Sequence, residues 1–267
     1  MIFLKGLWPY NFAQPQIRGD AIDRIYLDQY FNNKALRTNP KFKKIGDIML
    51  LAQQEVVERS PSDVRVFLRL AQMVDPIGLD DPSVYPAVIT ILREGWKHAP
   101  NRQDFYYYIA TMLGKIDRFD EGIAIMNDAV ALNPNIVRAR YYRGLLLGGA
   151  GREKEAREDF MWIRINNSSL SQLTGADHIG MISMYQLWGD RQSIADLILR
   201  AARGEIYHGY SSHFKFDALM YYIEQRDTDA VIAIAEYTAR TVPEYQDEME
   251  TVIDLTRQGL WNIIDKL

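Results

Sequence analysis

The sequence contains no cysteine in its 267 residues. Disulfide bonds, thiolate nucleophiles and zinc sites built on cysteine are therefore excluded. The lack of cysteine does not decide the compartment, so a cytoplasmic and a membrane-associated location both stay open.

An excess of positive charge is also missing. The chain has 31 lysines and arginines against 35 aspartates and glutamates, for a formal net charge of −4. Nucleic-acid-binding proteins need a basic face, so we expect no nucleic-acid partner. No run of basic residues is long enough to predict binding to anionic lipids.

Long hydrophobic runs are absent as well. The apolar stretch at residues 1–10 is interrupted by Lys5 and Pro9, so it is too short to span a bilayer. It also lacks the charged start and the small-residue cleavage site of a signal peptide. We predict an irregular N-terminal arm at 1–17, which either packs on the first helices or continues a membrane segment lying upstream.

Sequence motifs of catalysis are not found. There is no G-x-S-x-G elbow, and Gly148-Gly-Ala-Gly151 has neither a preceding strand nor the lysine of a phosphate-binding loop. Those glycines predict a helix that ends early in a loose turn, and the alternative is a groove floor left open for the backbone of a ligand. The acidic residues between Glu153 and Asp159 fit the solvated face of an amphipathic helix. We therefore expect no enzymatic activity and no cofactor.

Histidines are few and scattered, at positions 98, 178, 208 and 213. His213 and Asp217 are four residues apart and would share a helix face, with His208 just upstream. A metal site needs three or four convergent ligands, and one of these three candidates lies on a loop. We expect no metal site.

The most informative stretch that is present lies between Pro100 and Ser168. When the sequence is aligned with itself so that Pro134 matches Pro100, small residues align with small residues, as Gly144 does with Ala110. Under the same offset Gly122 aligns with Ala156, and Met126 with Phe160. Small residues in the middle of a helix let two backbones approach, while bulky apolar residues fill the space between helices. The pattern predicts helical hairpins.

Apolar periodicity and capping residues extend this prediction along the chain. We expect an irregular insert between Asp75 and Ser83, with Asp81 as the N-cap of the helix that follows, and a second insert from Gly204. Asp120 is expected to cap the second helix of the first regular hairpin. The expected helices are 20–37, 43–59, 64–74, 82–98, 105–113, 121–131, 153–165, 176–188, 192–203, 213–225, 228–241 and 244–266.

The offset from Pro100 to Pro134, with its alternation of small and large residues, matches a period of about 34 residues and resembles a tetratricopeptide repeat. The resemblance covers about residues 60–245. It implies an all-α, right-handed solenoid of helical hairpins with a concave groove, which binds partners and does not catalyse reactions. The implied organisation is an arm at 1–17, an N-terminal helix pair at 18–60, repeats at 61–243 and a C-terminal capping helix at 244–267.

The order of elements also resembles the soluble C-terminal repeat region of bacterial O-antigen ligase/polymerase-type membrane proteins. The residues that carry this resemblance are Lys5-Gly-Leu-Trp-Pro9, the helix end at Lys34–Pro40, and the closing phrases Ala233-Ile-Ala-Glu and Val242-Pro-Glu-Tyr-Gln-Asp-Glu. The multi-helix membrane part of that family is not in this chain, so the resemblance implies no active site here.

The tetratricopeptide resemblance places the first helix of each hairpin along the groove. Tyrosine and arginine offer large contact areas with a polar handle, and they dominate binding hot spots. The alternative is that half of these tyrosines pack between helices. The predicted groove residues are Arg65, Arg69, Tyr107, Tyr108, Thr111, Arg138, Tyr141 and Tyr142.

Two functions follow from these observations. The first is a protein–protein interaction scaffold that binds a protein or peptide segment in the groove. The second is the soluble appendage of an O-antigen ligase/polymerase-type protein in cell-surface polysaccharide assembly, with a membrane protein of glycan assembly as its partner.

Overall fold

The computed structural model describes residues 55, 57–60, 62–166, 172–206 and 209–264. Within this part of the chain all regular structure is helical, which confirms the all-α prediction. The chain forms two compact units, Met1–Pro134 and Asn135–Leu267, and each is described by itself. The predicted arm at 1–17, the predicted helix at 20–37 and most of that at 43–59 lie outside the described residues.

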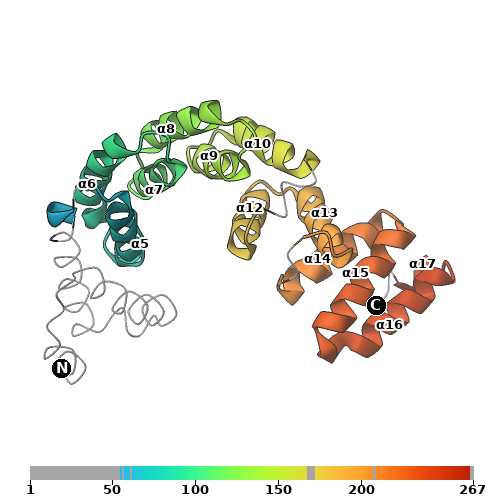
Figure 1. Cartoon of the computed structure of the whole chain (residues 1–267). Coiled ribbons are helices and arrows are strands. Elements are labelled where there is room, and N and C mark those ends of the chain that lie inside the picture. The colour runs from blue at the N-terminus through green and yellow to red at the C-terminus, as the bar shows by residue number, and fades with distance from the viewer. Residues whose placement is uncertain (1–54, 56, 61, 167–171, 207–208, 265–267) are drawn as a thin grey trace, which may run out of the picture. The chain divides into compact units, whose positions relative to one another are not determined.

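The described part of the first unit contains two successive helix pairs. Helix α5 (Val64–Asp80) leads through the short 3-10 helix η1 (Pro82–Val84) to α6 (Tyr85–His98), and α7 (Gln103–Gly114) pairs with α8 (Phe119–Leu132). α6 packs against both α5 and α7, and α5 also contacts α7 (Figure 1). The apolar faces of α5, α6 and α7 enclose one core, in which Phe67, Leu92 and Phe105 are almost completely buried.

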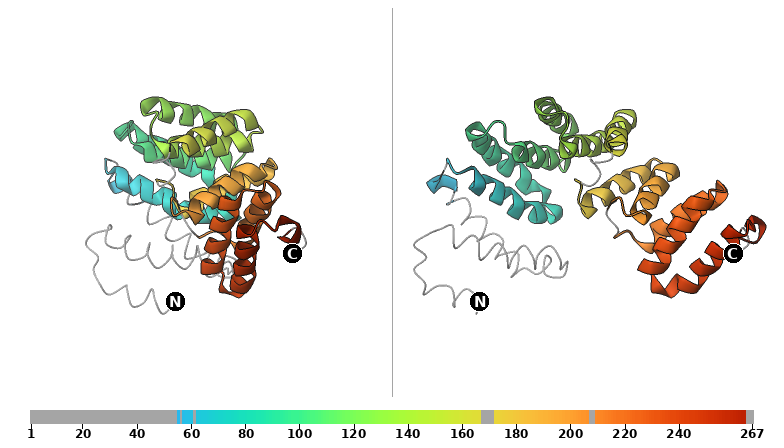
Figure 2. Two further views of the ribbon diagram at one scale, coloured as in Figure 1. Left: turned by 90° about the vertical axis from the view of Figure 1, so that its right-hand side faces the viewer. Right: turned by 45° about the vertical axis from the view of Figure 1, so that its right-hand side comes forward.

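Among the residues that the structure describes, the second unit contains three helix pairs and a terminal segment. The pairs are α9 (Val137–Gly149) with α10 (Glu153–Ile165), α12 (Gly175–Leu187) with α13 (Arg191–Ala202), and α14 (Ser212–Glu224) with α15 (Thr228–Thr241). The 3-10 helix η2 (Pro243–Tyr245), α16 (Gln246–Arg257) and α17 (Trp261–Ile264) follow. α16 packs against α15, and the two lie side by side near the C-terminus in Figure 2.

The hairpins have a constant internal spacing. In all four pairs from α7 to α15 the second helix starts at the same offset from the start of the first, as the bounds given above show. The starts of α7 and α9 also keep the tetratricopeptide period of about 34 residues. The starts of α12 and α14 come later than this period would place them. From α7 to α15 the extra residues therefore lie in the connections between hairpins, whereas in the earlier pair α5–α6 they lie inside the pair.

The turn inside each hairpin explains this constancy. Its left-handed residue is Asp117 (φ 60°), Gly151 (74°), Gly189 (66°) or Arg226 (57°), and a single residue always separates it from the start of the second helix. The next backbone N–H donates to the carbonyl five residues earlier, as Arg152 does to Leu147 at 2.8 Å. This Schellman pattern satisfies the last carbonyls of the first helix and sets the start of the second.

The predicted contact between small and large residues is present within the hairpins. A Cβ added at Gly144 on α9 would lie 2.5 Å from the Phe160 ring on α10, and one at Gly95 on α6 would lie 2.4 Å from the Phe67 ring on α5. Both phenylalanines are buried, at 0% and 2% exposure. The glycines therefore let a ring pack directly on a helix backbone.

Four local predictions are corrected. The first concerns the expected insert after Val74, because α5 continues to Asp80 through Pro76. A proline inside a helix costs about 3 kcal/mol, and the buried side chains of Phe67, Leu70 and Val74 outweigh that loss. Asp81 does cap the following η1, accepting a hydrogen bond from the Ser83 N–H.

The second correction concerns Asp120, which is not an N-cap. α8 begins at Phe119 with Arg118 in the cap position, so Asp120 lies in the first turn. The Schellman turn around Asp117 fixes this start. A carboxylate in the first turn still interacts favourably with the helix dipole.

The third and fourth corrections concern glycines. α9 does not end early, since it runs through Gly148 to Gly149 before the turn at Gly151. The segment 244–266 is not one long helix, because Gly259 (φ 70°) ends α16 with the Leu260 N–H donating to the Leu255 carbonyl at 2.9 Å. This is the same turn that ends the first helix of each hairpin.

Candidate functional site

The predicted groove residues of the first unit lie on two neighbouring first helices. Arg65 is exposed and Arg69 half-buried on α5, and Tyr107, Tyr108 and Thr111 are half-buried on α7. We call Arg69, Tyr107, Tyr108 and Thr111 the first-helix face. Because α5 packs against α7, the structure brings the sides of these two helices together.

Local hydrogen bonds order several of these side chains. The Tyr107 hydroxyl donates to Oε1 of Gln103 one turn earlier, and the Thr111 hydroxyl donates to the Tyr107 carbonyl at 2.8 Å. Arg65 is bound to Asp63 through Nε at 2.9 Å and Nη2 at 2.8 Å, and this interaction lowers the pKa of the Asp63 carboxyl. Arg65 thus belongs to the start of α5 and lies outside the first-helix face.

In the second unit the predicted residues separate into different environments. Arg138 is exposed on α9 and Tyr142 is half-buried. Tyr141 is only 4% exposed. A Cβ added at Gly180 would lie 2.3 Å from the Tyr141 hydroxyl oxygen. Gly180 on α12 therefore leaves room for Tyr141, which belongs to the core and not to a binding surface. Burial, followed by the nearby Asp177 charge, raises the pKa of Tyr141 well above its ordinary value.

The structure also reveals a polar network that the sequence analysis missed. Asp159 on α10 is 2% exposed and accepts hydrogen bonds from Arg143 at 2.6 and 2.7 Å and from Arg140 at 3.2 Å. The Arg140 guanidinium also lies 4.2 Å from the Trp162 ring centroid. Arg143 occupies the position that Ile109 has in the preceding repeat. A charged residue at a position that is apolar in the other repeat could have indicated a buried counterion such as Asp159.

The histidines have separate surroundings. His178 is completely buried, with Nδ1 2.7 Å from the Tyr210 hydroxyl, whereas His213 lies 3.2 Å from Asp217 on the exposed side of α14. His208 lies outside the described residues. In the part of the chain that the structure describes, no three potential metal ligands gather. The helices of that part are also too short or too polar for any of them to cross a membrane.

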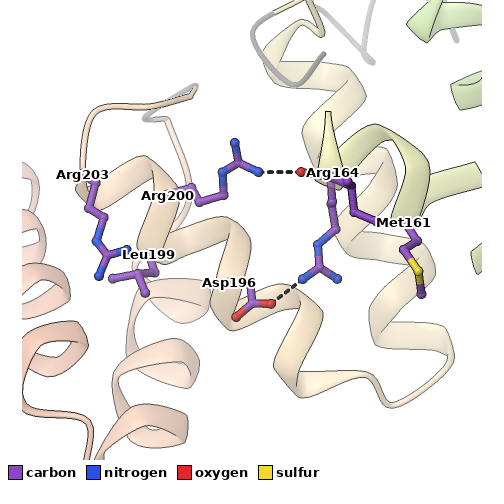
Figure 3. Close-up of a pocket in the computed structure, with 7 residues that line it drawn as sticks. Met161, Arg164, Asp196, Leu199, Arg200 and Arg203 are labelled. Atoms are coloured by element: carbon purple, nitrogen blue, oxygen red, sulfur yellow. Dashed lines mark hydrogen bonds and ion pairs between the residues drawn. The ribbon is translucent and has the colours of Figure 1, made fainter. Parts of the chain in front are cut away.

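A pocket of about 410 Å³ lies between α10 and α13 in the second unit. α10 contributes Met161, Arg164 and Ile165, α13 contributes Asp196, Leu199 and Arg200, and Arg203 is the C-cap residue that follows α13 (Figure 3). The spacings are those of one face on each helix. We call this site the arginine pocket. The sequence analysis did not find it, because its residues come from second helices of different hairpins.

Long side chains join α10 to α13 across the arginine pocket. Arg164 donates to the Ser193 hydroxyl at 2.7 Å and pairs with Asp196, while Arg200 donates to the Arg164 carbonyl at 2.9 Å (Figure 3). The other carboxylate oxygen of Asp196 accepts a 2.8 Å hydrogen bond from Tyr222. These bonds fix the walls of the pocket. Burial and the bond to Asp196 raise the pKa of the Tyr222 hydroxyl.

Charge in the arginine pocket is not balanced. Arg164 has Asp196 as its counterion, and Arg200 is paired with Glu205 at 3.0 Å. Arg203 is exposed at the C-terminal end of α13 and forms no ion pair with any residue in the described ranges. On the opposite wall, Met161 and Ile165 of α10 expose 57% and 70% of their surface, while Leu199 of α13 is a buried apolar residue near Arg203 (Figure 3). The pocket therefore combines an uncompensated cation with apolar surface.

No protein-family model and no curated protein matches this chain. Among solved structures, the chain is similar to the crystal structure of MamA, with 15% sequence identity over 84% of this chain and 94% of that chain, at a TM-score of 0.37. A likeness of this size carries no inference about function, and the all-α hairpin architecture follows from the helices described above.

Proposed function

We propose that the protein is a non-catalytic interaction scaffold that binds a protein or peptide segment along its first helices. The observation that carries this proposal is the partial exposure of two adjacent aromatic side chains, Tyr107 and Tyr108, on α7. Their neighbours Phe105, Tyr106 and Ile109 on the same helix are buried. The core of the first unit thus uses mainly the side of α7 that carries Phe105 and Ile109, Tyr108 packs against its edge, and both tyrosines stay partly open.

The neighbouring helix adds charge to this surface. Arg69 on α5 is half-buried, and Thr111 lies one turn after Tyr107 and Tyr108 on α7. Tyrosine rings with one wet edge, together with an arginine, are typical of the residues that dominate protein–protein hot spots. In the second unit, Arg138 and Tyr142 belong to the same proposed set, whereas the buried Tyr141 does not.

The proposal is tested by identifying and then measuring a partner. Chemical cross-linking in source cells would identify candidate segments, and calorimetry would measure their affinity for the purified chain. Each anchor side chain is expected to contribute about 2 kcal/mol or more. Tyr107→Ala or Tyr108→Ala should therefore weaken a bound segment by about 30-fold, since about 1.4 kcal/mol is a factor of ten.

Tyr245→Ala is the matched control, because Tyr245 is also partly exposed, at 36%, but lies on η2 in the second unit, where its ring packs on Phe216 of α14, and it is not one of the proposed binding residues. It should leave the affinity unchanged. If the wild type and both α7 variants bind the partner segment with equal affinity and have the same helix content, the first-helix face is not the binding surface.

Cell fractionation separates the two functions that the sequence suggests. A soluble species of 30.9 kDa, the mass of this chain, supports a free scaffold. A membrane-bound species well above that mass supports instead the appendage of an O-antigen ligase/polymerase-type protein. In that case the partner segment should come from a membrane protein of glycan assembly.

A further inference from the structure

We infer that the arginine pocket is a second binding site, which takes an acidic peptide segment in which a carboxylate lies next to an aliphatic side chain. This inference goes beyond the proposed function, because the pocket lies between the second helices α10 and α13 and shares no residue with the first-helix face. The two sites can therefore succeed or fail independently.

The first argument is structural. α13 packs directly against α15, the second helix of the following hairpin, but it is joined to α10 through the side chains of Arg164 and Arg200. The connection from the end of α10 at Ile165 to the start of α12 at Gly175 is longer than that from α8 to α9. The stretch of chain between these two hairpins is thus longer than in the regular repeat. A space of about 410 Å³ remains between α10 and α13, within the range of ligand sites.

The second argument is charge. Asp196 is engaged on both oxygens, by Arg164 and by the Tyr222 hydroxyl, so this carboxylate already has its partners. Arg203 adds a positive charge that no described carboxylate neutralises. An incoming carboxylate would accept a charge-assisted hydrogen bond from the Arg203 guanidinium, whose fork of N–H donors suits carboxylate geometry.

The third argument is the apolar surface in the same pocket. Leu199 precedes Arg203 by one turn on α13, and Met161 and Ile165 stand opposite on α10 with more than half of their surface exposed. An aliphatic side chain adjacent to the carboxylate would cover these groups. Methionine also adapts its shape readily to a binding partner.

The openness of the pocket favours a peptide over a free small molecule. A small-ligand site normally buries most of its ligand, whereas here Met161 and Ile165 lie on the outer surface of α10. A peptide can place one carboxylate and one aliphatic side chain in the pocket. It then gains further contact area from its flanking residues on the exposed sides of α10 and α13.

Methyl-group NMR on the full chain tests the inference directly, because Met161, Ile165 and Leu199 each place a methyl reporter in the pocket. The probe is the dipeptide acetyl-Leu-Glu-amide. We expect saturable shifts of these methyl resonances. The uncharged acetyl-Leu-Gln-amide loses the charge-assisted hydrogen bond, and acetyl-Ser-Glu-amide loses the aliphatic contact. Each should therefore bind at least about tenfold more weakly than acetyl-Leu-Glu-amide.

Arg203→Glu should weaken the dipeptide by at least about tenfold while the methyl spectrum away from the pocket stays unchanged. Arg240→Glu is the matched control, because Arg240 is another exposed arginine near a helix C-terminus, on α15, and it does not line the pocket. This control should leave the affinity unaltered. Higher salt should weaken wild-type binding, since the recognised charge is near the surface.

Several results would overturn the inference. One is the absence of saturable shifts at the three pocket methyl groups, and another is equal affinity for the glutamate and glutamine dipeptides. Unchanged affinity after Arg203→Glu would have the same consequence. Octanoate serves as a lipid-like comparison, and binding of octanoate without binding of the dipeptide would refute the assignment to a peptide.

Discussion

Replacing Gly144 by alanine tests how the hairpin α9–α10 is packed. The added Cβ would lie 2.5 Å from one Phe160 ring carbon and 3.0 Å from two others, whereas carbon atoms in good contact are about 3.5–4.0 Å apart. The Phe160 ring is fully buried, with ring centroids of Tyr185 and Trp188 at 5.8 and 5.9 Å. It therefore has little room to retreat.

Two opposing terms set the size of the effect. Overpacking a core by one or more methyl groups costs about 1–3 kcal/mol. Alanine gains up to about 1 kcal/mol over glycine inside a helix. We expect Gly144→Ala to lower the free energy of unfolding by about 1 kcal/mol, and Gly144→Leu to lower it by about 2–3 kcal/mol.

Urea unfolding followed by circular dichroism measures this change, and a double-mutant cycle assigns its cause. In a Phe160→Leu background the smaller side chain should relieve the contact, so that Gly144→Ala becomes neutral or stabilising. If Gly144→Ala stabilises the wild type as much as it stabilises the Phe160→Leu variant, the ring does not oppose a Cβ, and the alignment of small and large residues across the hairpin is wrong.

Two further predictions concern buried charges in the second unit. Asp159→Asn should destabilise the unit by about 3 kcal/mol, because it leaves the partly buried Arg140 and Arg143 without their carboxylate. A change below about 1 kcal/mol in chemical denaturation would show that these ion pairs matter little. Lys215 is 3% exposed, and its Nζ donates a hydrogen bond to the Thr241 hydroxyl at 2.7 Å. Burial lowers the pKa of this lysine. Lys215→Met should therefore stabilise the protein by roughly 1 kcal/mol at neutral pH. The lysine pKa is lower in the folded than in the unfolded chain, so the stability of the wild type should rise with pH between these two pKa values. The stability difference between Lys215→Met and the wild type should shrink over the same range. A stability difference that stays constant there would contradict the explanation.

Local sequence features predicted much of the secondary structure. The bounds of α10 and α15 follow from turns at Gly151-Arg152 and Arg226-Asp227, and the structure places both helices as expected, at Glu153–Ile165 and Thr228–Thr241. The helix through Pro76 was missed for a physical reason. A proline signals a local preference, and the burial of Phe67, Leu70 and Val74 against neighbouring helices overrides that preference.

Candidate site residues were harder to predict than helices. Tyr107 and Tyr141 occupy equivalent positions in successive repeats, yet Tyr107 is half-buried and Tyr141 only 4% exposed. The difference arises in the second unit because Gly180, on the first helix of the following hairpin, leaves space for the Tyr141 hydroxyl. A periodic pattern gives the direction of a side chain from its own helix, but not the size of the neighbour it meets.

The sequence by itself determined the hairpin, because a hairpin depends on interactions between residues close in the chain. Apolar spacing specifies the buried side of each helix, small residues allow close packing, and a left-handed turn residue ends the first helix. The tertiary structure alone decided which charged residues converge. Arg164 comes from one hairpin, whereas Asp196 and Arg203 come from the next, and the three line one pocket between α10 and the end of α13. Contacts of this kind depend on how one hairpin stacks on the next, and no local pattern in the sequence encodes that stacking.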